Sequence, residues 1–488
     1  MQQVAVGLTP PSLKAEHHLQ RPTPMGGGKR HSSAASTSGK KSRPSPSPPF
    51  TADDLTPVLS LLASAVSLSL RFLSDSDLLL LPSQTLSLES SLLSSSFSLS
   101  RLLSLLPSSS LQSLQTLALE TSPSSSSSSS SWFLRFLSSS SSHGFDPRWI
   151  EVFRMSKPSF YLLLQHLSPS LLSDPSSGPP DHKLGAALFR LAHAAPFRGV
   201  ARRFGLPSPA AACRAFYQVC KAVADQLGHL FELSSDLQRV VQGFTWMSLP
   251  NCCGVLGFAR FSVEGELKGG SVIAQGLVDS EGRFLDVSVG WHGSMTPAQI
   301  ITRTKLYKAQ HVVLAGGPPV ELNGVSVPRY LLGSSCCPLL PWLLTPFKMV
   351  DSRSSSSKDS IFNSVHARGM ELADRAFGRV RARWQLLQTS WKEDCAEALP
   401  YVVVASCLLH NYLIKCSEPM PDEIEVCVKE LKFLDFEGKE DEAGERIRDA
   451  LASHMSLWAF SQTINICVSR GIDPNCTTRG AFLISTIR

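Results

Sequence analysis

The sequence lacks the cysteine spacing that small zinc modules require. It contains twelve cysteines, but no two of them are separated by two residues. The missing Cys-x-x-Cys pair excludes a zinc ribbon of the usual kind and argues against the disulfide framework of a small secreted domain. Two adjacent pairs, Cys252-Cys253 and Cys336-Cys337, lie in apolar stretches, and we expect these thiols to be buried and reduced.

Long hydrophobic runs are also missing. No stretch of 18 or more consecutive apolar residues occurs, and the leucine run from Leu78 to Leu81 is far too short to cross a bilayer. The first residues do not have the charged and then apolar layout of a secretory signal. We therefore expect a soluble intracellular protein with no membrane partner.

Excess charge is missing from most of the chain. The formal net charge is +6, but seven of the 46 basic residues and one of the 40 acidic residues lie within residues 1–50. The remainder carries as many acids as bases, so the folded body has no global field that attracts a polyanion.

The basic residues of the first segment have a recognisable spacing. Residues 1–50 are rich in proline, glycine, serine and lysine, and we expect them to be disordered because they cannot bury enough apolar surface to offset chain entropy. Two basic clusters nine residues apart have the form of a bipartite nuclear import signal. This signal predicts a nuclear location. The alternative is a solvated basic tail with no role in import. The residues concerned are Lys29, Arg30, Lys40, Lys41 and Arg43.

Residues 51–142 consist mainly of leucine and serine, with an uninterrupted serine run from Ser124 to Ser131. Segments 57–73 and 111–119 have helical leucine spacing, but serine has a poor helix propensity and no convincing cap precedes them. We expect a mostly disordered, low-complexity region with one or two conditional helices, which either dock a partner or act as a spacer.

A helical domain is predicted over residues 145–245. Ser156 caps one helix, Gly205 ends another, and Ser208-Pro209 begins a further helix that runs to about residue 227. The layout of two helices joined by a short glycine-containing turn is that of a helix-turn-helix.

This pair of helices has a local basic charge, with seven basic residues and no acidic one between positions 183 and 221. Arginine and glutamine suit guanine and adenine edges in a major groove, and arginines before the turn could hold phosphates. An ordinary hairpin with a solvated basic face is the alternative, because the first turn of the second helix holds only alanines where a recognition helix usually carries base-reading groups. The candidate DNA-binding residues are Arg202, Arg203, Arg214, Gln218 and Lys221.

From residue 249 the pattern changes to strands and then to helices. β-Rich runs are expected at 255–263, 271–278, 283–289 and 330–336, and helices at 362–387 and 397–415. Residues 417–488 begin with an acidic linker, in which eleven acids and three lysines lie between positions 418 and 445, and a short helical pattern follows. The periodicity alone predicts a mixed α/β fold.

Three short blocks, Leu249–Phe261, Tyr330–Pro338 and Asp374–Trp384, carry a family resemblance. They resemble the catalytic domain of PIF/Harbinger-type DDE transposases, and still more closely the plant proteins domesticated from those elements. The resemblance covers roughly residues 145–415 and implies an RNase H-like DDE core at 249–416, preceded by the helix-turn-helix-like domain. Further matching blocks are Gly282–Val287, Gly293–Met295 and Leu408–Asn411.

In the active family each of the three blocks carries one metal-binding carboxylate, and the matching positions here are Gly257, Ser334 and Asp374. Cleavage of a phosphodiester by two divalent ions needs anionic oxygen ligands that offset the repulsion between the ions. Glycine offers no side chain, serine offers a neutral oxygen, and aspartate is one methylene shorter than the family's glutamate. We therefore expect no catalytic residue, no bound divalent metal or other cofactor, and no enzymatic activity.

Other acids lie on or near the strands, but none is expected to replace the missing ligands. Asp279 lies in a turn, and Glu264 and Glu266 lie beside a glycine-rich loop, so we expect all three to be solvated. Asp286 lies in a segment that the family shares, where it is not one of the metal ligands.

The resemblance implies a catalytically inactive, transposase-derived nuclear protein that acts as a scaffold or accessory subunit of a chromatin or transcription-regulatory complex. The implied partners are subunits of such a complex and a Myb-like or trihelix DNA-binding protein. Two alternatives stay open: a sequence-preferring regulator that binds duplex DNA through the helix-turn-helix, and a metal-dependent endonuclease. The sequence does not distinguish an activating role from a silencing one.

Overall fold

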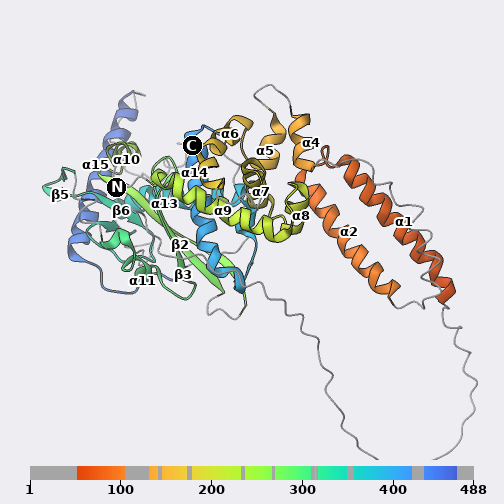
Figure 1. Ribbon diagram of the computed structural model, residues 1–488. Helices are drawn as coiled ribbons and strands as arrows, with labels where there is room; N and C mark the ends of the chain where they lie inside the picture. Colours follow the sequence, from red (N-terminus) through yellow and green to blue (C-terminus); the bar gives the residue numbers. More distant parts are fainter. Residues whose placement is uncertain are drawn as a thin grey trace, which may run out of the picture. The chain divides into compact units, whose positions relative to one another are not determined.

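The computed structural model describes residues 52–104, 131–140, 146–172, 178–231, 237–265, 270–308, 314, 317–348, 357–419 and 433–469 (Figure 1). The chain divides into two compact units, residues 1–128 and 129–488. The residues of the nuclear import signal lie outside the described part, as does the segment 111–119.

The described part of the first unit is a helical hairpin of α1 (Ala52–Ser76) and α2 (Pro82–Leu103), seen in Figure 1 as two long helices joined by a tight turn. The helix predicted at 57–73 lies within α1, whereas the expectation that residues 52–104 are mostly disordered is wrong. Serine hydroxyls bond within the helix, as Ser69 Oγ does by donating to the Ala65 carbonyl at 2.8 Å. The two helices contact each other, and Leu59 and Leu73 of α1 are buried.

The described part of the second unit opens with a series of helices. Four of them begin with side-chain caps: Ser131 accepts from the Leu134 amide, Asp146 from the Arg148 amide, Ser156 from the Ser159 amide and Ser208 from the Ala211 amide. The caps at Ser156 and Ser208 were predicted from the sequence. The helices are α4 (Trp132–Ser139), α5 (Pro147–Phe153), α6 (Lys157–Leu171), α7 (Pro180–His193), α8 (Phe197–Arg203), α9 (Pro209–Leu227) and α10 (Leu237–Trp246).

Helix α4 belongs to this folded unit, although its residues were assigned to the low-complexity region. Its aromatic side chains are buried, with Phe133 fully inaccessible and Trp132 stacked on Phe136 at 5.1 Å between ring centroids. Phe136 also contacts Trp149 of α5, and Phe133 contacts Phe204 after α8. The large apolar area of this aromatic cluster is what holds α4 on the helical layer.

A mixed sheet follows, with strand order β3-β2-β1-β6-β7. β2 is antiparallel to both β1 and β3, whereas β6 runs parallel to β1 and β7 parallel to β6. A short β8 pairs with the end of β1, and β4 and β5 form a separate hairpin. The strands are β1 (Cys252–Glu264), β2 (Ser271–Val278), β3 (Phe284–His292), β4 (Val320–Leu322), β5 (Val325–Val327), β6 (Tyr330–Gly333), β7 (Leu343–Leu344) and β8 (Trp391–Lys392).

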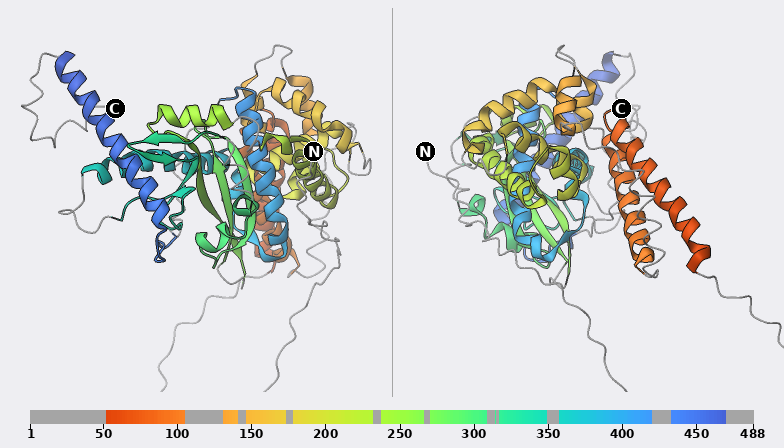
Figure 2. Two further views of the ribbon diagram at one scale, coloured as in Figure 1. Left: turned by 90° about the vertical axis from the view of Figure 1, so that its left-hand side faces the viewer. Right: turned by 45° about the vertical axis from the view of Figure 1, so that its right-hand side comes forward.

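Further helices complete the described part of the unit. A short α11 (Pro297–Ile301) follows β3, and α13 (Ser357–Arg383) packs against β1, β2 and β6. α14 (Leu399–Lys415) lies between β3 and α9, and α15 (Glu442–Ser469) lies along α13 and the β4–β5 hairpin (Figure 2). Helices and a mixed sheet share one core, so the expected α/β fold is confirmed.

Helix α14 joins the helical layer to the sheet. The predicted boundary between residues 245 and 249 marks a change of secondary structure inside one compact unit, because α9 and α14 pack together and the Tyr412 hydroxyl donates to the Ser159 carbonyl at 2.9 Å.

The window Cys395–Lys415 is long and apolar enough to cross a membrane, with a mean hydropathy of 1.3, but 72% of it is buried inside the fold. Core helices of folded domains have the same composition.

Candidate functional site

The first of the three family positions, Gly257, is a close contact between strand and helix. It lies in the buried part of β1, opposite Gly276 of β2. A Cβ atom added at Gly257 would stand 2.6 Å from the Cβ of Ala373 on α13, and one added at Gly276 would stand 2.8 Å from the ring of Phe377. Real Cβ atoms do not approach so closely, so α13 rests on the bare backbone of the two strands.

The second position, Ser334, directly follows the last residue of β6. It is half-buried, and its hydroxyl lies 2.9 Å from the sulfur of Cys336. A hydrogen bond from the Cys337 thiol is the main cause that lowers the pKa of Cys336 to about 7, and the hydrogen bond with Ser334 acts in the same direction. The predicted burial of this cysteine pair is confirmed, and both thiols are free. The serine oxygen therefore contacts a pair of thiols at the end of the strand.

The third position, Asp374, lies on the outer side of α13. Ala373 is fully buried against β1, and the next residue is exposed. The next residue, Arg375, donates to Glu371 one turn earlier at 2.7 Å, an exposed pair at i and i+4. The turn that presses Ala373 onto the strand therefore directs Asp374 outwards, and no second carboxylate stands at the two strand positions.

These donors do not fit a pair of divalent ions. The three positions supply no side chain, one hydroxyl and one exposed carboxylate, whereas two dications need several bridging anionic oxygens. Within the ranges that the structure describes, no group of three or more His, Cys, Asp or Glu residues could hold a metal ion.

Of the neighbouring acids that were expected to be solvated, Asp279 is buried instead. Asp279 was expected to be solvated, but only 1% of it is exposed. Its carboxylate accepts from the backbone amides of Glu281 and Arg283 and pairs with the Arg283 guanidinium at 2.7 Å, because the β2–β3 turn is closed around it. Glu264 is exposed as predicted, Asp286 is half-buried on β3, where burial raises its pKa, and Glu266 lies outside the described residues.

Two of the family blocks, Leu408–Asn411 and Gly282–Val287, form hydrogen bonds that join α14 to the start of β3. Asn411 accepts from the Phe284 amide at 2.9 Å and donates to the Phe284 carbonyl at 2.7 Å, while His410 Nε2 lies 3.0 Å from the Gly282 carbonyl. On α13, His366 Nε2 lies 3.1 Å from the carbonyl of Gly333, the residue before Ser334. Burial lowers the pKa of His366 and His410 to about 4, so both rings are neutral and donate to these carbonyls. The sequence identified the His-Asn motif but not its structural role.

The candidate DNA-binding residues divide into two groups. Arg203 is 4% exposed, with its guanidinium 5.2 Å from the centre of the Phe189 ring, so it is not positioned to contact a phosphate. Gln218 is half-buried and donates to the Ser170 carbonyl at 3.3 Å, which fixes it to the end of α6. The sequence could not separate inward from outward members of a basic run. The exposed members are Arg202, Arg214 and Lys221, of which Lys221 pairs with Asp225 at 2.6 Å.

Comparison with known proteins confirms the family resemblance. Residues 264–411 match the DDE superfamily endonuclease family. The chain is 26% identical over 331 residues to the protein Antagonist of like heterochromatin protein 1 of Arabidopsis thaliana. The matched region covers 62% of this chain and 82% of the relative. It is also 26% identical over 344 residues to an ALP1-like protein of the same plant, covering 64% and 82%. No solved structure matches the chain.

Proposed function

We propose that this protein is a catalytically inactive, transposase-derived nuclear protein that serves as a scaffold or accessory subunit of a chromatin or transcription-regulatory complex. The observation that carries the proposal is the contact of α13 with Gly257, where the 2.6 Å to Ala373 leaves no space for a carboxylate. The centre has lost a first metal ligand and also the room that such a ligand would occupy.

The electrostatic argument supports the same conclusion. Two dications a few ångströms apart repel each other strongly, and that repulsion must be offset by anionic ligands. Here Gly257 and Ser334 contribute no charge, and Asp374 is exposed on the outer side of its helix. A metal-dependent endonuclease is therefore the least supported of the three functions.

The order of the sheet supports an RNase H-like assignment for the DDE core. Three antiparallel strands, β1 to β3, form one side, and β6 and β7 add parallel strands on the other side of β1. The three family positions follow this layout, with Gly257 on β1, Ser334 after β6 and Asp374 on α13. The scaffold of a nuclease is kept while its ligands are not.

Partners and location follow from the relatives and the basic tail. The printed name of one relative describes an antagonist of a heterochromatin protein, which supports a chromatin-related partner for this chain. We propose a Myb-like or trihelix protein as the DNA-binding partner, and import to the nucleus through Lys29-Arg30 and Lys40-Lys41-Ser42-Arg43. Purification of the tagged protein from nuclei should recover such partners; recovery of neither a chromatin subunit nor a Myb-like protein would contradict the scaffold role.

Inactivity is tested by incubating the purified full-length protein with supercoiled plasmid and Mg²⁺ or Mn²⁺. We expect no nicking above buffer at either metal. Asp374→Ala is the decisive variant, because nicking by the wild type that disappears in this variant would show a working centre. Glu371→Ala, an exposed acid one turn earlier on α13, is the matched control.

A DNA-binding regulator is the second candidate, supported by the exposure of Arg202 and Arg214 on α8 and α9. Binding through these side chains should show the salt dependence of phosphate contacts. We expect Arg202→Ala with Arg214→Ala to weaken binding of a duplex at 50 mM salt by about tenfold, whereas Arg239→Ala, an exposed arginine on α10, should not. Equal affinities of all three proteins would remove this candidate.

A further inference from the structure

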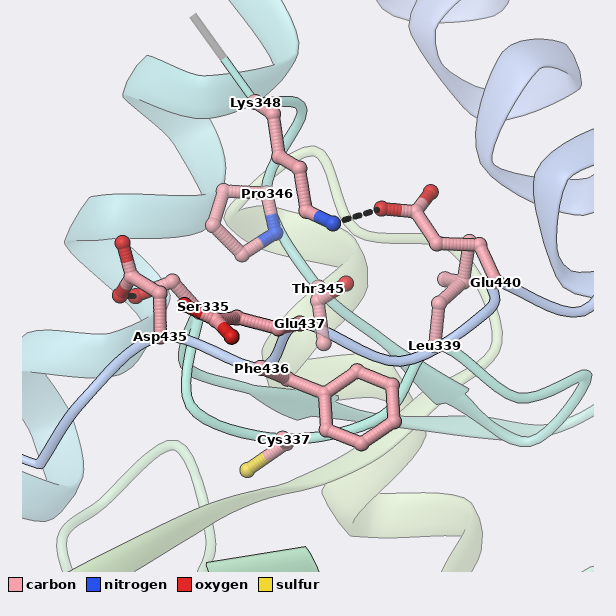
Figure 3. Close-up of a pocket in the computed structure, with 10 residues that line it drawn as sticks. All are labelled: Ser335, Cys337, Leu339, Thr345, Pro346, Lys348, Asp435, Phe436, Glu437 and Glu440. Carbon is pink, nitrogen blue, oxygen red and sulfur yellow. Dashed lines mark hydrogen bonds and ion pairs between the residues drawn. The ribbon is translucent and has the colours of Figure 1, made fainter.

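A short extended segment, Phe433–Glu440, lies across the DDE body beside the end of β6 (Figure 3). It contains no helix or strand and leads into α15. Its contacts with residues 258–348, which are distant in sequence, reach the loop that contains Ser334, and its last residue also pairs with Arg448 of α15.

The first anchor is aromatic. The ring of Phe433 packs against that of Phe258 on β1, with centroids 5.8 Å apart and nearly edge to face. The guanidinium of Arg260 lies 4.1 Å from the centre of the same ring, and it also donates to the Gly293 carbonyl at 2.7 Å. A cation fixed over a ring face is a specific contact for an aromatic side chain.

The second anchor is the backbone of Ser335. The amide of Phe436 donates to the Ser335 carbonyl at 2.9 Å, and the Ser335 hydroxyl donates to the Asp435 carboxylate at 2.5 Å. Figure 3 shows Asp435 and Ser335 turned towards each other at one side of the pocket. Main-chain pairing of this kind holds extended peptides on protein edges without reading their sequence.

The third anchor combines a pocket and a charge. Phe436 stands at a cavity of about 240 Å³ that Leu339, Thr345 and Pro346 also line. Beyond it, Glu440 pairs with Lys348 at 3.2 Å and with Arg448 of α15 at 2.7 Å. The residues between the anchors are solvated, and Leu434 is 89% exposed, so the segment is held at a few points only.

We propose that this groove is a binding site for an extended acidic peptide with two aromatic residues three positions apart. The chain's own Phe433–Glu440 occupies the site in cis, and a peptide of the same chemistry on a partner protein replaces it in trans. The inference rests on the proposed scaffold function and places a partner beside the former catalytic centre. A tethered segment competes through its effective concentration, so a partner peptide displaces it when the affinity of that peptide for the groove exceeds that of the cis segment by enough to offset the tether.

The test uses a fluorescent peptide with the sequence of residues 431–441 and the full-length protein. In the Phe433→Ala with Phe436→Ala variant the cis segment loses its aromatic anchors while every residue of the groove is kept. We expect this variant to bind the peptide at least tenfold more tightly than the wild type does, as read by fluorescence anisotropy. A peptide with both phenylalanines replaced by alanine should not bind.

A charge reversal on the groove separates this site from general electrostatic attraction. In the double-alanine background, Lys348→Glu should weaken the peptide about tenfold. Lys358→Glu is the matched control, because Lys358 is comparably exposed and faces Asp449 of α15 at 3.9 Å instead of the groove. Absence of binding by the double variant at 1 mM peptide, or equal binding of the alanine peptide, would overturn the proposal. Neither result bears on inactivity, which the plasmid assay reads separately.

Discussion

Substitution of Gly257 by alanine measures how tightly the former centre is closed. The glycine lies in a regular strand with an ordinary backbone conformation, so an alanine meets no backbone strain there. Its Cβ would stand 2.6 Å from that of Ala373, and α13 would have to move outwards. Overpacking of a core costs about 1–3 kcal/mol, and we expect a loss of about 2 kcal/mol in the free energy of unfolding.

A double-mutant cycle isolates the contact. Ala373→Gly alone should cost about 1 kcal/mol, because glycine weakens a helix interior. In that background the added methyl group at position 257 has space, so Gly257→Ala should cost almost nothing. The expected coupling energy between the two positions is therefore about 2 kcal/mol in favour of the double variant.

The assay is urea unfolding of the four proteins, followed by circular dichroism. Val263→Ala, at another buried β1 position, serves as the control and should show no coupling with Ala373→Gly. A cost below about 0.5 kcal/mol for Gly257→Ala in the wild-type background would refute the reasoning. It would mean that α13 leaves room for a side chain, and the steric part of the case for inactivity would fall.

Three further predictions concern stability. Burial lowers the pKa of His193, His366 and His410 to about 4, so the unfolded chain binds more protons than the folded chain between pH 6.5 and 4. The free energy of unfolding should therefore fall on acidification, by about 1 kcal/mol per histidine at pH 5.5, and His366→Gln should reduce the difference between the urea midpoints at pH 7.5 and 5.5. Glu418→Gln should cost about 1–2 kcal/mol, because Glu418 accepts from the Ser156 amide and from two serine hydroxyls, whereas Glu397→Gln on the surface should be neutral. Asn411→Ala should cost about 2–4 kcal/mol by leaving buried groups of the β2–β3 hairpin unpaired, whereas an unchanged thermal midpoint would contradict this role.

Much of the fold of the second unit follows from local patterns in the sequence. Strand β2 was predicted with its observed bounds, and the helix from Ser208 begins at its predicted cap. These elements have strong local signals: a fully apolar run between turns and a Ser-Pro start. The leucine and serine region was misjudged because propensity undervalues helices whose hydroxyls bond to their own backbone.

The candidate site was only half accessible from the sequence. The loss of two carboxylates can be read directly from Gly257 and Ser334, once the blocks are compared with the family. The close packing of α13 over Gly257 cannot be read from the sequence, because it depends on the position of α13 on the sheet. Likewise, Arg202 and Arg203 are neighbours in sequence, but the helix turns one to solvent and buries the other against aromatic rings.

The absence of a carboxylate at position 257 and the close packing of α13 on β1 support each other physically. A carboxylate on β1 would hold α13 away from the sheet, and without it an open space would cost contacts along the whole strand. The described structure instead fills that space with Ala373 and Phe377, which pack on Gly257 and Gly276. Restoring an aspartate at position 257 would therefore have to break an apolar interface before it could bind a cation. The contact of α13 with Gly257 and Gly276 is therefore part of the apolar core.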